Sequence, residues 1–150
     1  MPALKGYTYC FSVLARDKVG KTSAWSAERC TATALDDRAL AATSGWARAT
    51  SSATYAGTVT STRTTGQTLT RTSVQARRIY LVATTCTSGG TIGVYWNGAL
   101  LRTVSLNASS TTYKKVILIK DFGAVRSGTL TIKALNTGRT YIDGVSLSRA

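Results

Sequence analysis

The chain has 150 residues, of which 43% are hydrophobic, and a formal net charge of +13. This length gives room for one ordinary domain, or for a small domain and a fragment. No apolar run approaches the roughly 18 residues that predict a membrane span, and the amino-terminal stretch MPALKGYTYCFS has no apolar signal core. Frequent Thr, Ser, Val and Tyr in short alternating runs predict an all-β fold.

The residue types also bear on catalysis. The chain contains no His, which removes Ser–His and Cys–His nucleophilic pairs and the usual zinc ligand sets. Its six acidic residues show no paired motif of the kind that glycoside hydrolysis needs. The Gly-rich stretch TSGGTIG lacks the Lys and the following helix of a phosphate-binding loop. We therefore expect no enzyme activity, no cofactor and no metal.

The positive charge is uneven along the chain. Five basic and three acidic residues occur up to Asp36, whereas fourteen basic and three acidic residues follow from Asp37 onward. Such a surface attracts polyanions, whether nucleic acid, teichoic-type polymers or acidic polysaccharide. The basic residues are scattered singly, however, and no zinc-knuckle, basic-helix or RNA-recognition signature accompanies them. We therefore expect a solubilising surface and no specific nucleic-acid binding.

The first predicted element is a β-ribbon within residues 1–35. The stretch YTYCFSVLAR alternates as a strand does, and ERCTATAL is a second, shorter strand. Cys10 and Cys30 lie symmetrically about Gly20, so that they face each other across the predicted hairpin within disulfide reach. A bridge between them would indicate an oxidising compartment and would leave Cys86 as an unpaired thiol at a strand end. Trp25 is interpreted as a packing residue of this hairpin.

The stretch LKGYTYCFSVLARDKVGKTSAWS resembles the end of a fibronectin type III domain of bacterial secreted proteins. This resemblance implies that Tyr9 is the corner tyrosine and that Phe11, Val13 and Ala15 face a sandwich core. It covers only the last two of the roughly seven strands of such a domain. Either the chain is a piece of a longer protein, or these side chains pack on something else, such as the remainder of this chain or a neighbouring chain.

Residues 36–44 form a predicted linker. The stretch ALDDRALAATSG is polar and Ala-rich, and it can form one helical turn with Asp36 or Asp37 as its cap. Two adjacent carboxylates alone are too few for a calcium site.

Residues 45–150 are predicted to form one β-sandwich or jelly roll, with turn signals at about ten-residue spacing. The continuously apolar run VILI suits the middle of a sandwich. The predicted strands are 46–50, 58–63, 68–72, 78–84, 91–96, 100–106, 115–121, 129–134 and 140–148.

The stretch TIGVYWNGALLRTVSL predicts a hairpin. Asn97-Gly98 lies between alternating runs, and both central residues of a type I′ turn need positive φ. In a two-residue turn Trp96 opposes Ala99, and Tyr95 opposes Leu100. The face that carries Trp96 is the more apolar, so we expect it to point into the core and Tyr95 to lie on the other face.

Over about residues 45–148 the order of the motifs VYWNG, GTLTI and YIDG resembles jelly-roll modules with a galactose-binding-like fold, which are appended to bacterial extracellular enzymes and surface proteins. Many such modules bind carbohydrate, so the resemblance implies an extracellular, non-catalytic module that binds a polysaccharide or cell-surface glycan. Leu130 stands where a late-strand His is common. Asp143 in YIDG is interpreted as structural, bonded to a turn amide, with a ligand or calcium contact as the alternative.

Candidate ligand-binding residues are aromatic or polar side chains near turns. Trp46 and Tyr55 flank the Ser/Thr-rich loop ARATSSATYAG and can stack on a sugar ring, although Trp46 can equally plug one end of the sandwich. The other candidates come from the predicted hairpin: Tyr95, Asn97 and Arg102. The expected partner is a polysaccharide or other cell-surface polymer, which can be a polyanion. The alternative function is a structural or assembly role, in which exposed strand edges pair with another chain.

Overall fold

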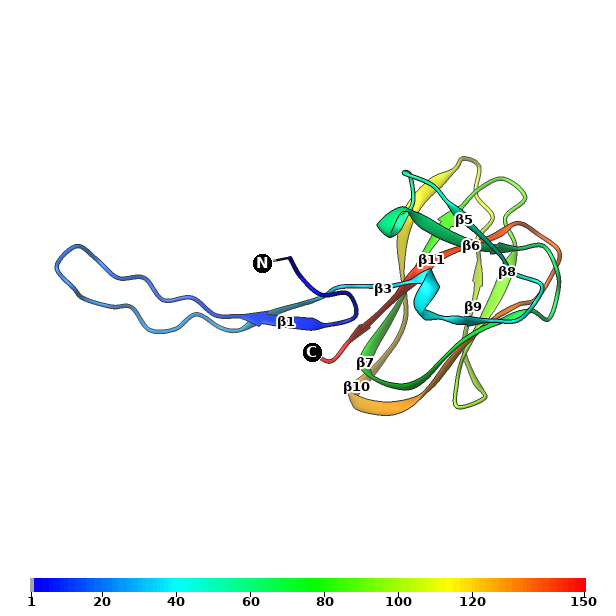
Figure 1. Cartoon of the computed structure of the whole chain (residues 1–150). Helices are drawn as coiled ribbons and strands as arrows, with labels where there is room; N and C mark the ends of the chain where they lie inside the picture. The colour runs from blue at the N-terminus through cyan, green and yellow to red at the C-terminus, as the bar shows by residue number, and fades with distance from the viewer. Residues whose placement is uncertain (1) are drawn as a thin grey trace.

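In the computed structural model, which describes residues 2–150, the chain forms a β-sandwich from which a two-stranded arm projects (Figure 1). Within these residues no helix is long and apolar enough to cross a membrane. The strands and 3₁₀ turns are, in chain order, β1 (Thr8–Phe11), β2 (Arg29–Ala32), β3 (Leu35–Asp36), η1 (Asp37–Ala39), β4 (Ala41–Ala42), β5 (Ala47–Thr50), η2 (Tyr55–Gly57), β6 (Thr58–Thr62), β7 (Thr68–Thr85), β8 (Thr91–Trp96), β9 (Ala99–Ser105), β10 (Thr112–Ala134) and β11 (Thr140–Ser148).

The sandwich consists of two antiparallel layers that share their two longest strands. The first layer has the order β5–β6–β11–β7–β10, and the second has the order β4–β7–β10–β8–β9. Residues 78–85 of β7 pair with 112–121 of β10 in the first layer, whereas residues 68–76 pair with 126–133 in the second. The fold is therefore an all-β sandwich of the jelly-roll type, which confirms the predicted fold class.

The two long strands correct the predicted strand list. The predicted strands at 68–72 and 78–84 are the two halves of β7, and those at 115–121 and 129–134 are the two halves of β10. Shifts in the β7–β10 register and positive φ angles of 55° at Ser73 and 73° at Gly123 mark the bends. The sequence signals that were interpreted as gaps between two strands are thus bends, at which one long strand passes from one layer to the other.

The core lies between the two layers and is built by alternation along the strands. Its largest fully buried side chains are Leu40, Leu69, Ile79, Leu81, Ile92, Leu106, Leu130, Ile132 and Ile142. At roughly 25 cal/mol per Å² of apolar surface, this burial is the main stabilisation of the sandwich.

The β8–β9 hairpin forms as predicted. Tyr95 pairs with Leu100 and Trp96 with Ala99. The φ angles of the two turn residues, Asn97 and Gly98, are 49° and 82°, as a type I′ turn requires. Trp96 is buried in the core and contacts the ring of Phe122 at a centroid distance of 5.2 Å.

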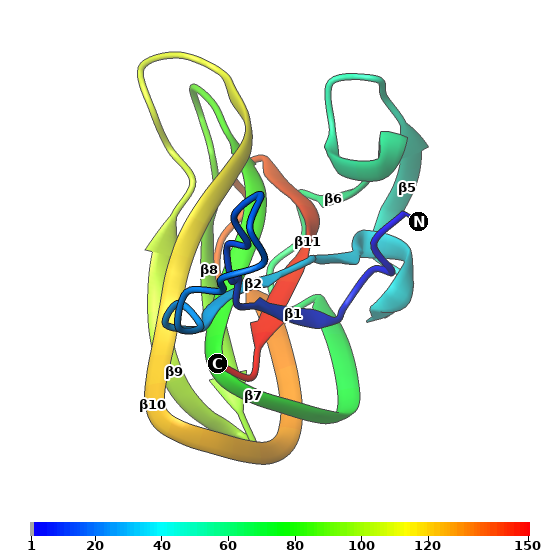
Figure 2. The ribbon, with the colours of Figure 1, turned by 90° about the vertical axis from the view of Figure 1, so that its left-hand side faces the viewer.

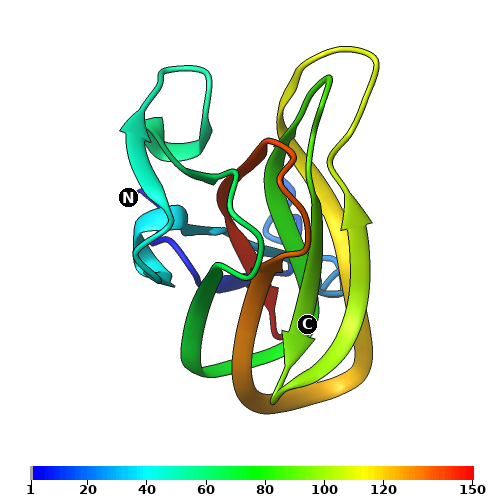
Figure 3. The same ribbon diagram turned by 90° about the vertical axis from the view of Figure 1, so that its right-hand side faces the viewer.

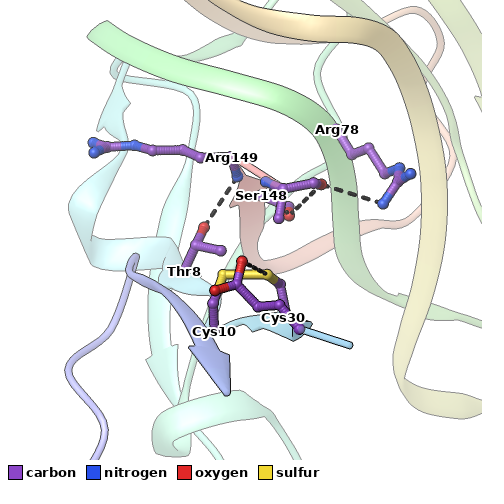
Figure 4. The surroundings of a disulfide bond; sticks show 8 residues. Thr8, Cys10, Cys30, Arg78, Ser148 and Arg149 are labelled. Carbon is purple, nitrogen blue, oxygen red and sulfur yellow. Dashed lines mark hydrogen bonds between the residues drawn. A yellow bond between two sulfur atoms is a disulfide. The ribbon is translucent and has the colours of Figure 1, made fainter. Parts of the chain in front are cut away.

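The arm is the predicted ribbon of β1 and β2. Cys10 lies opposite Cys30 in the register, and the two sulfurs form the predicted disulfide, which leaves Cys86 buried and free within the described chain. The hydroxyl oxygen of Tyr9 accepts a hydrogen bond from the backbone N–H of Leu4 at 2.7 Å, the contact expected of a corner tyrosine. Figure 4 shows that Thr8, next to the disulfide, accepts from the backbone N–H of Arg149.

Beyond the disulfide the arm extends away from the sandwich as a narrow ribbon (Figure 1). The side chains of Phe11, Val13 and Trp25 are 58%, 67% and 66% exposed. The expectation that Trp25 packs within the hairpin is therefore wrong, because a two-stranded ribbon has no second layer to cover its faces. The fibronectin type III character of the arm stays a prediction.

Residues 36–44 contribute to the sandwich. β3 pairs with β11, β4 pairs with β7, and the predicted helical turn is the 3₁₀ turn η1. Asp36 occupies the predicted N-cap position of this turn, but its side chain makes no capping hydrogen bond. The oxygens of Asp36 and Asp37 instead accept hydrogen bonds from the hydroxyls of Thr58 and Thr60.

Candidate functional site

The outer face of the first layer carries the features expected of a binding surface. Along β7, Tyr80, Val82 and Thr84 alternate with the core residues Ile79, Leu81 and Ala83, and therefore point outward. Thr84 pairs with Tyr141 of β11, which places the two side chains side by side on this face. Three hollows lie over it.

Two loops enclose the first of these hollows. Loops 51–57 and 106–111 rise from the same end of the sandwich, on opposite sides of β7 and β11 (Figures 2 and 3). The hollow between them has a volume of about 320 Å³, and Thr54, Thr84, Tyr113 and Tyr141 are among its lining residues. Volumes near 300 Å³ are at the lower end of the range for small-ligand sites.

A second hollow of about 280 Å³ continues this groove toward the edge of the first layer. Arg63, Arg139 and Tyr141 contribute to its lining. Arg139 and Tyr141 line both hollows, so the two hollows adjoin each other, and we name them together the loop groove. Two tyrosine rings, several hydroxyls and two guanidinium groups therefore surround one opening.

The third hollow lies between the arm and the sandwich. It has a volume of about 630 Å³, and Tyr55, Tyr80, Arg78 and Lys114 line it together with residues of β2. Arg78 is committed to structure, because its Nε donates to Asp121 at 2.7 Å (Figure 4 shows Arg78 beside the arm). This hydrogen bond from Arg78 lowers the pKa of Asp121 and raises that of Arg78.

A buried acidic cluster lies beneath the same face. The β3–β11 register places Asp36 opposite Gly144. Asp36 and Asp37 are therefore close to Asp143 in space, although more than a hundred residues separate them in the sequence. Gly144 has a φ angle of 155°, and a Cβ there would lie 2.0 Å from the carbonyl oxygen of Leu35. Only glycine permits this close approach of the two strands.

Asp143 has no exposed surface, and neither of its carboxylate oxygens has a hydrogen-bond partner among residues 2–150. The interpretation of Asp143 as bonded to a turn amide is therefore wrong. Burial raises its pKa to about 6, and the negative charge of Asp37 acts in the same direction. The backbone amides of Lys114 and Tyr55 act to lower this pKa, although they do not meet the geometry of hydrogen bonds.

These oxygens fit a hard divalent cation such as Ca²⁺, which takes carboxylate and carbonyl ligands. The two unpartnered oxygens of Asp143 are the observation that supports the fit, since a buried carboxylate without a partner is costly. Asp37 and Asp143 are the residues that would hold the ion. Among residues 2–150, the group of three potential ligand residues with atoms within 4.8 Å of one another is Cys10, Glu28 and Cys30, but both sulfurs are consumed by the disulfide.

The residues predicted to bind ligand fall in three separate places. Trp46 is buried in the core and presents no exposed ring, so the structure matches the packing alternative for it. Tyr55 lines the hollow beside the arm, and its hydroxyl donates to the carbonyl oxygen of Ala34 at 3.0 Å. Lys5 lies 5.8 Å from the centroid of the Tyr55 ring.

The remaining three predicted residues lie on the β8–β9 hairpin of the second layer. Tyr95 lies over Gly93 of its own strand. The side-chain oxygen of Asn97 accepts from the backbone N–H of Thr129 at 2.8 Å, and Arg102 donates to the carbonyl oxygen of Leu118. Asn97 and Arg102 are thus engaged in holding strands together, and the loop groove was not predicted from the sequence.

Comparisons with known proteins identify the fold and no family. No protein-family model matches the chain, and no curated protein matches it. The solved structures described below are 11–16% identical to this chain, so their similarity shows the fold alone.

Three solved structures illustrate this similarity. A carbohydrate-binding module, CsCBM6-3 from Clostridium stercorarium in complex with cellobiose, has a TM-score of 0.56 at 11% identity, covering 79% of this chain and 94% of that one. A family 43 arabinoxylan arabinofuranohydrolase from Bacillus subtilis in complex with cellotetraose has a TM-score of 0.61 at 14% identity, covering 91% and 33%. A family 87 α-1,3-glucanase from Streptomyces thermodiastaticus has a TM-score of 0.58 at 16% identity, covering 79% and 26%.

The length covered distinguishes these neighbours. The chain spans about a quarter to a third of the enzymes' length, but 94% of the carbohydrate-binding module. The same β-sandwich fold therefore occurs in a carbohydrate-binding module and in parts of larger carbohydrate-active enzymes.

Proposed function

We propose that the chain is a non-catalytic, extracellular module that binds a polysaccharide or cell-surface glycan through the loop groove. The observation that carries this proposal is that Tyr113 and Tyr141, from two different strands, line one hydroxyl-rich hollow. Aromatic rings stack on the apolar faces of sugars while neighbouring polar groups fix orientation. The disulfide supports an oxidising, extracellular setting, and the similar module in complex with cellobiose supports the ligand class.

A glycan array with the full chain tests this proposal. We expect saturable binding that weakens at least tenfold in Tyr113→Ala and Tyr141→Ala, with the thermal melting of both variants retained. Tyr95→Ala is the matched control, because it removes a tyrosine from the second layer and should leave binding unchanged. Loss of binding only in Tyr95→Ala would instead place the site on the β8–β9 hairpin, with Asn97 and Arg102. An array without any binding would contradict the proposal.

We further propose that the acidic cluster of Asp37 and Asp143 holds a structural divalent cation. The ion would supply charge neutralisation at a buried carboxylate pair and would tie η1, which carries Asp37, to β11, which carries Asp143. It has no role in a reaction in this proposal.

A second candidate function is assembly through the arm. The exposed side chains of Phe11, Val13 and Trp25 on a ribbon with open strand edges favour it. Sedimentation velocity over a hundredfold concentration range tests it: assembly predicts oligomers that disappear in a Val13→Ser, Trp25→Ser double variant. A monomer at all concentrations would contradict self-association.

A further inference from the structure

The loop groove has a one-sided charge. Arg63 and Arg139 contribute to its lining, and no Asp or Glu does so among the residues that the structure describes. Neither arginine is within 4.0 Å of a carboxylate in the described part of the chain, where the ion pairs involve Lys5, Arg38, Arg77 and Arg78 instead. The two guanidinium groups are therefore available to a ligand.

Arg139 is held firmly by its backbone. Its N–H donates to the carbonyl oxygen of Ser88 at 2.9 Å, and its carbonyl oxygen accepts from the N–H of Gly90 at 2.7 Å. Gly90 and Gly138 pack so closely that a Cβ on Gly138 would lie 2.5 Å from the Cα of Gly90. This contact fixes the backbone of the loop at Arg139. The Cα of Arg139 is therefore held in place, with its side chain among those that line both hollows.

The groove offers no carboxylate acceptor to a neutral sugar among the residues that the structure describes. A neutral sugar presents many hydroxyl donors, and the strongest acceptors for them are carboxylates, which this lining lacks. The hydroxyl of Thr84 on the floor is buried and has no hydrogen-bond partner within residues 2–150. The hydroxyl of Thr84 can donate one hydrogen bond and accept others, whereas the two arginines supply donors only.

We infer that the loop groove binds an acidic glycan, with a carboxylate or sulfate group of the sugar at Arg139 and Arg63 and the sugar ring against Tyr141. Guanidinium pairs with such planar or multi-oxygen anions through two parallel hydrogen bonds. Tyr141 lines both hollows, so it lies between Arg63, which lines only the second hollow, and Tyr113, which lines only the first. This inference rests on the proposed function, because it names the class of glycan for the same site.

Matched polymer pairs test the inference and separate the two anions. Polygalacturonate is compared with its fully methyl-esterified form, and dextran sulfate with dextran, by affinity electrophoresis and titration calorimetry at about 150 mM salt. We expect at least one acidic polymer to bind at least tenfold more tightly than its neutral counterpart. Preference within the first pair assigns a carboxylate, and preference within the second assigns a sulfate.

Charge-matched variants show whether the groove is responsible. Arg139→Gln and Arg63→Gln should each weaken binding of the acidic polymer at least tenfold. Arg16→Gln removes the same charge from the arm and should change it less than threefold. Equal losses in all three variants, equal binding of DNA, equal affinity for the neutral polymers, or no binding of either acidic polymer would overturn the inference. Neutral polymers that bind as tightly as the acidic ones, with that binding lost in Tyr141→Ala, would overturn the acidic preference while leaving the proposed function standing. Binding unchanged in Tyr113→Ala and Tyr141→Ala would contradict the proposed function itself.

Discussion

Asp143 follows Ile142, which lies in the core, on a strand whose alternation is broken at this point. A register shift between Ile142 and Gly144 marks a β-bulge in the β11–β7 pairing. A bulge adds a residue that breaks the alternation of faces, and here that residue is a carboxylate with no exposed surface. Its raised pKa is a direct consequence of this burial.

In the metal-free protein, the contribution of Asp143 to the free energy of unfolding should be larger at low pH than at neutral pH. The pKa of Asp143 is raised from 3.8 to about 6, so the folded state binds the proton more tightly than the unfolded state. Its stabilising effect is full below about pH 4 and is lost as the pH rises through 6. With a chelator at pH 7.5 we expect the free energy of unfolding of Asp143→Asn to exceed that of the wild type by on the order of 1–3 kcal/mol, which is measured as a higher melting temperature, and the difference to shrink toward pH 5.

Added Ca²⁺ should reverse this order. The wild type should gain several degrees in melting temperature, and Asp143→Asn should gain little, because the ion needs the ionised carboxylate. Glu28→Gln, which removes an exposed carboxylate from the arm, is the matched control and should respond to Ca²⁺ as the wild type does. A wild type indifferent to Ca²⁺ would contradict the proposed cation site.

The burial of a single side chain was predictable where local alternation decides it. The location of the loop groove was not predictable from the sequence. Trp96 could be placed in the core because its neighbours along the strand alternate strictly. Trp46 lies beside a polar loop and was considered for stacking, yet it packs inside. Tyr141 precedes the core residue Ile142, so alternation indicates that it faces outward, whereas Tyr113 lies between Thr112 and Lys114 and has no apolar neighbour that would mark its face. Which outward side chains share a groove depends on long-range strand order, and local periodicity does not contain it.

At the scale of elements, the arm and the sandwich are connected sparsely. The arm contacts the carboxy-terminal residues through the hydrogen bond between Thr8 and Arg149, and the two strands of the ribbon are held together by one disulfide. The structure of the arm was predictable only in part. The symmetry of the two cysteines about Gly20 predicted the disulfide, whereas the exposure of the ribbon's faces depends on what surrounds the ribbon and could not be predicted. The arm should therefore be able to lose its order without the sandwich unfolding.

Removing the disulfide should affect the arm alone. In a Cys10→Ser, Cys30→Ser double variant we expect amide hydrogen exchange to rise through residues 7–33 and to stay unchanged in β7 and β11. The bridge closes a loop with a sequence separation of 20, worth roughly 3 kcal/mol of chain entropy. Because the arm can open locally, that loss should lower the melting temperature of the sandwich by no more than a degree or two. A large fall would show that arm and sandwich unfold as one unit.

At the scale of the whole molecule, the positive charge is largely uncompensated. Of the nineteen Lys and Arg residues, four form ion pairs within residues 2–150. The arginines that hold strands together, such as Arg48 and Arg102, donate to backbone carbonyl oxygens and so keep their charge. The molecule therefore presents a diffuse positive field in addition to the local charge of the loop groove.

This diffuse field should give binding that is sensitive to salt and blind to sequence. We expect retention of the protein on duplex DNA to fall by at least about tenfold between 50 and 200 mM salt, with the same slope for unrelated sequences. Filter binding with two duplexes of different sequence measures both quantities. Retention that survives high salt, or that prefers one duplex, would mean that a specific nucleic-acid contact exists.

The long strands β7 and β10 also set the order of events in folding. Their pairs join residues as distant as Thr68 and Lys133, whereas the arm joins Cys10 to Cys30. A local hairpin closes in microseconds, but all-β folds built on distant pairs need milliseconds to seconds. During synthesis at roughly 5–20 residues per second, both strands of the arm are complete while β10 has yet to be made. Cys10 and Cys30 can therefore come together before any core of the sandwich exists, and the bridge can form as soon as the chain meets an oxidising compartment.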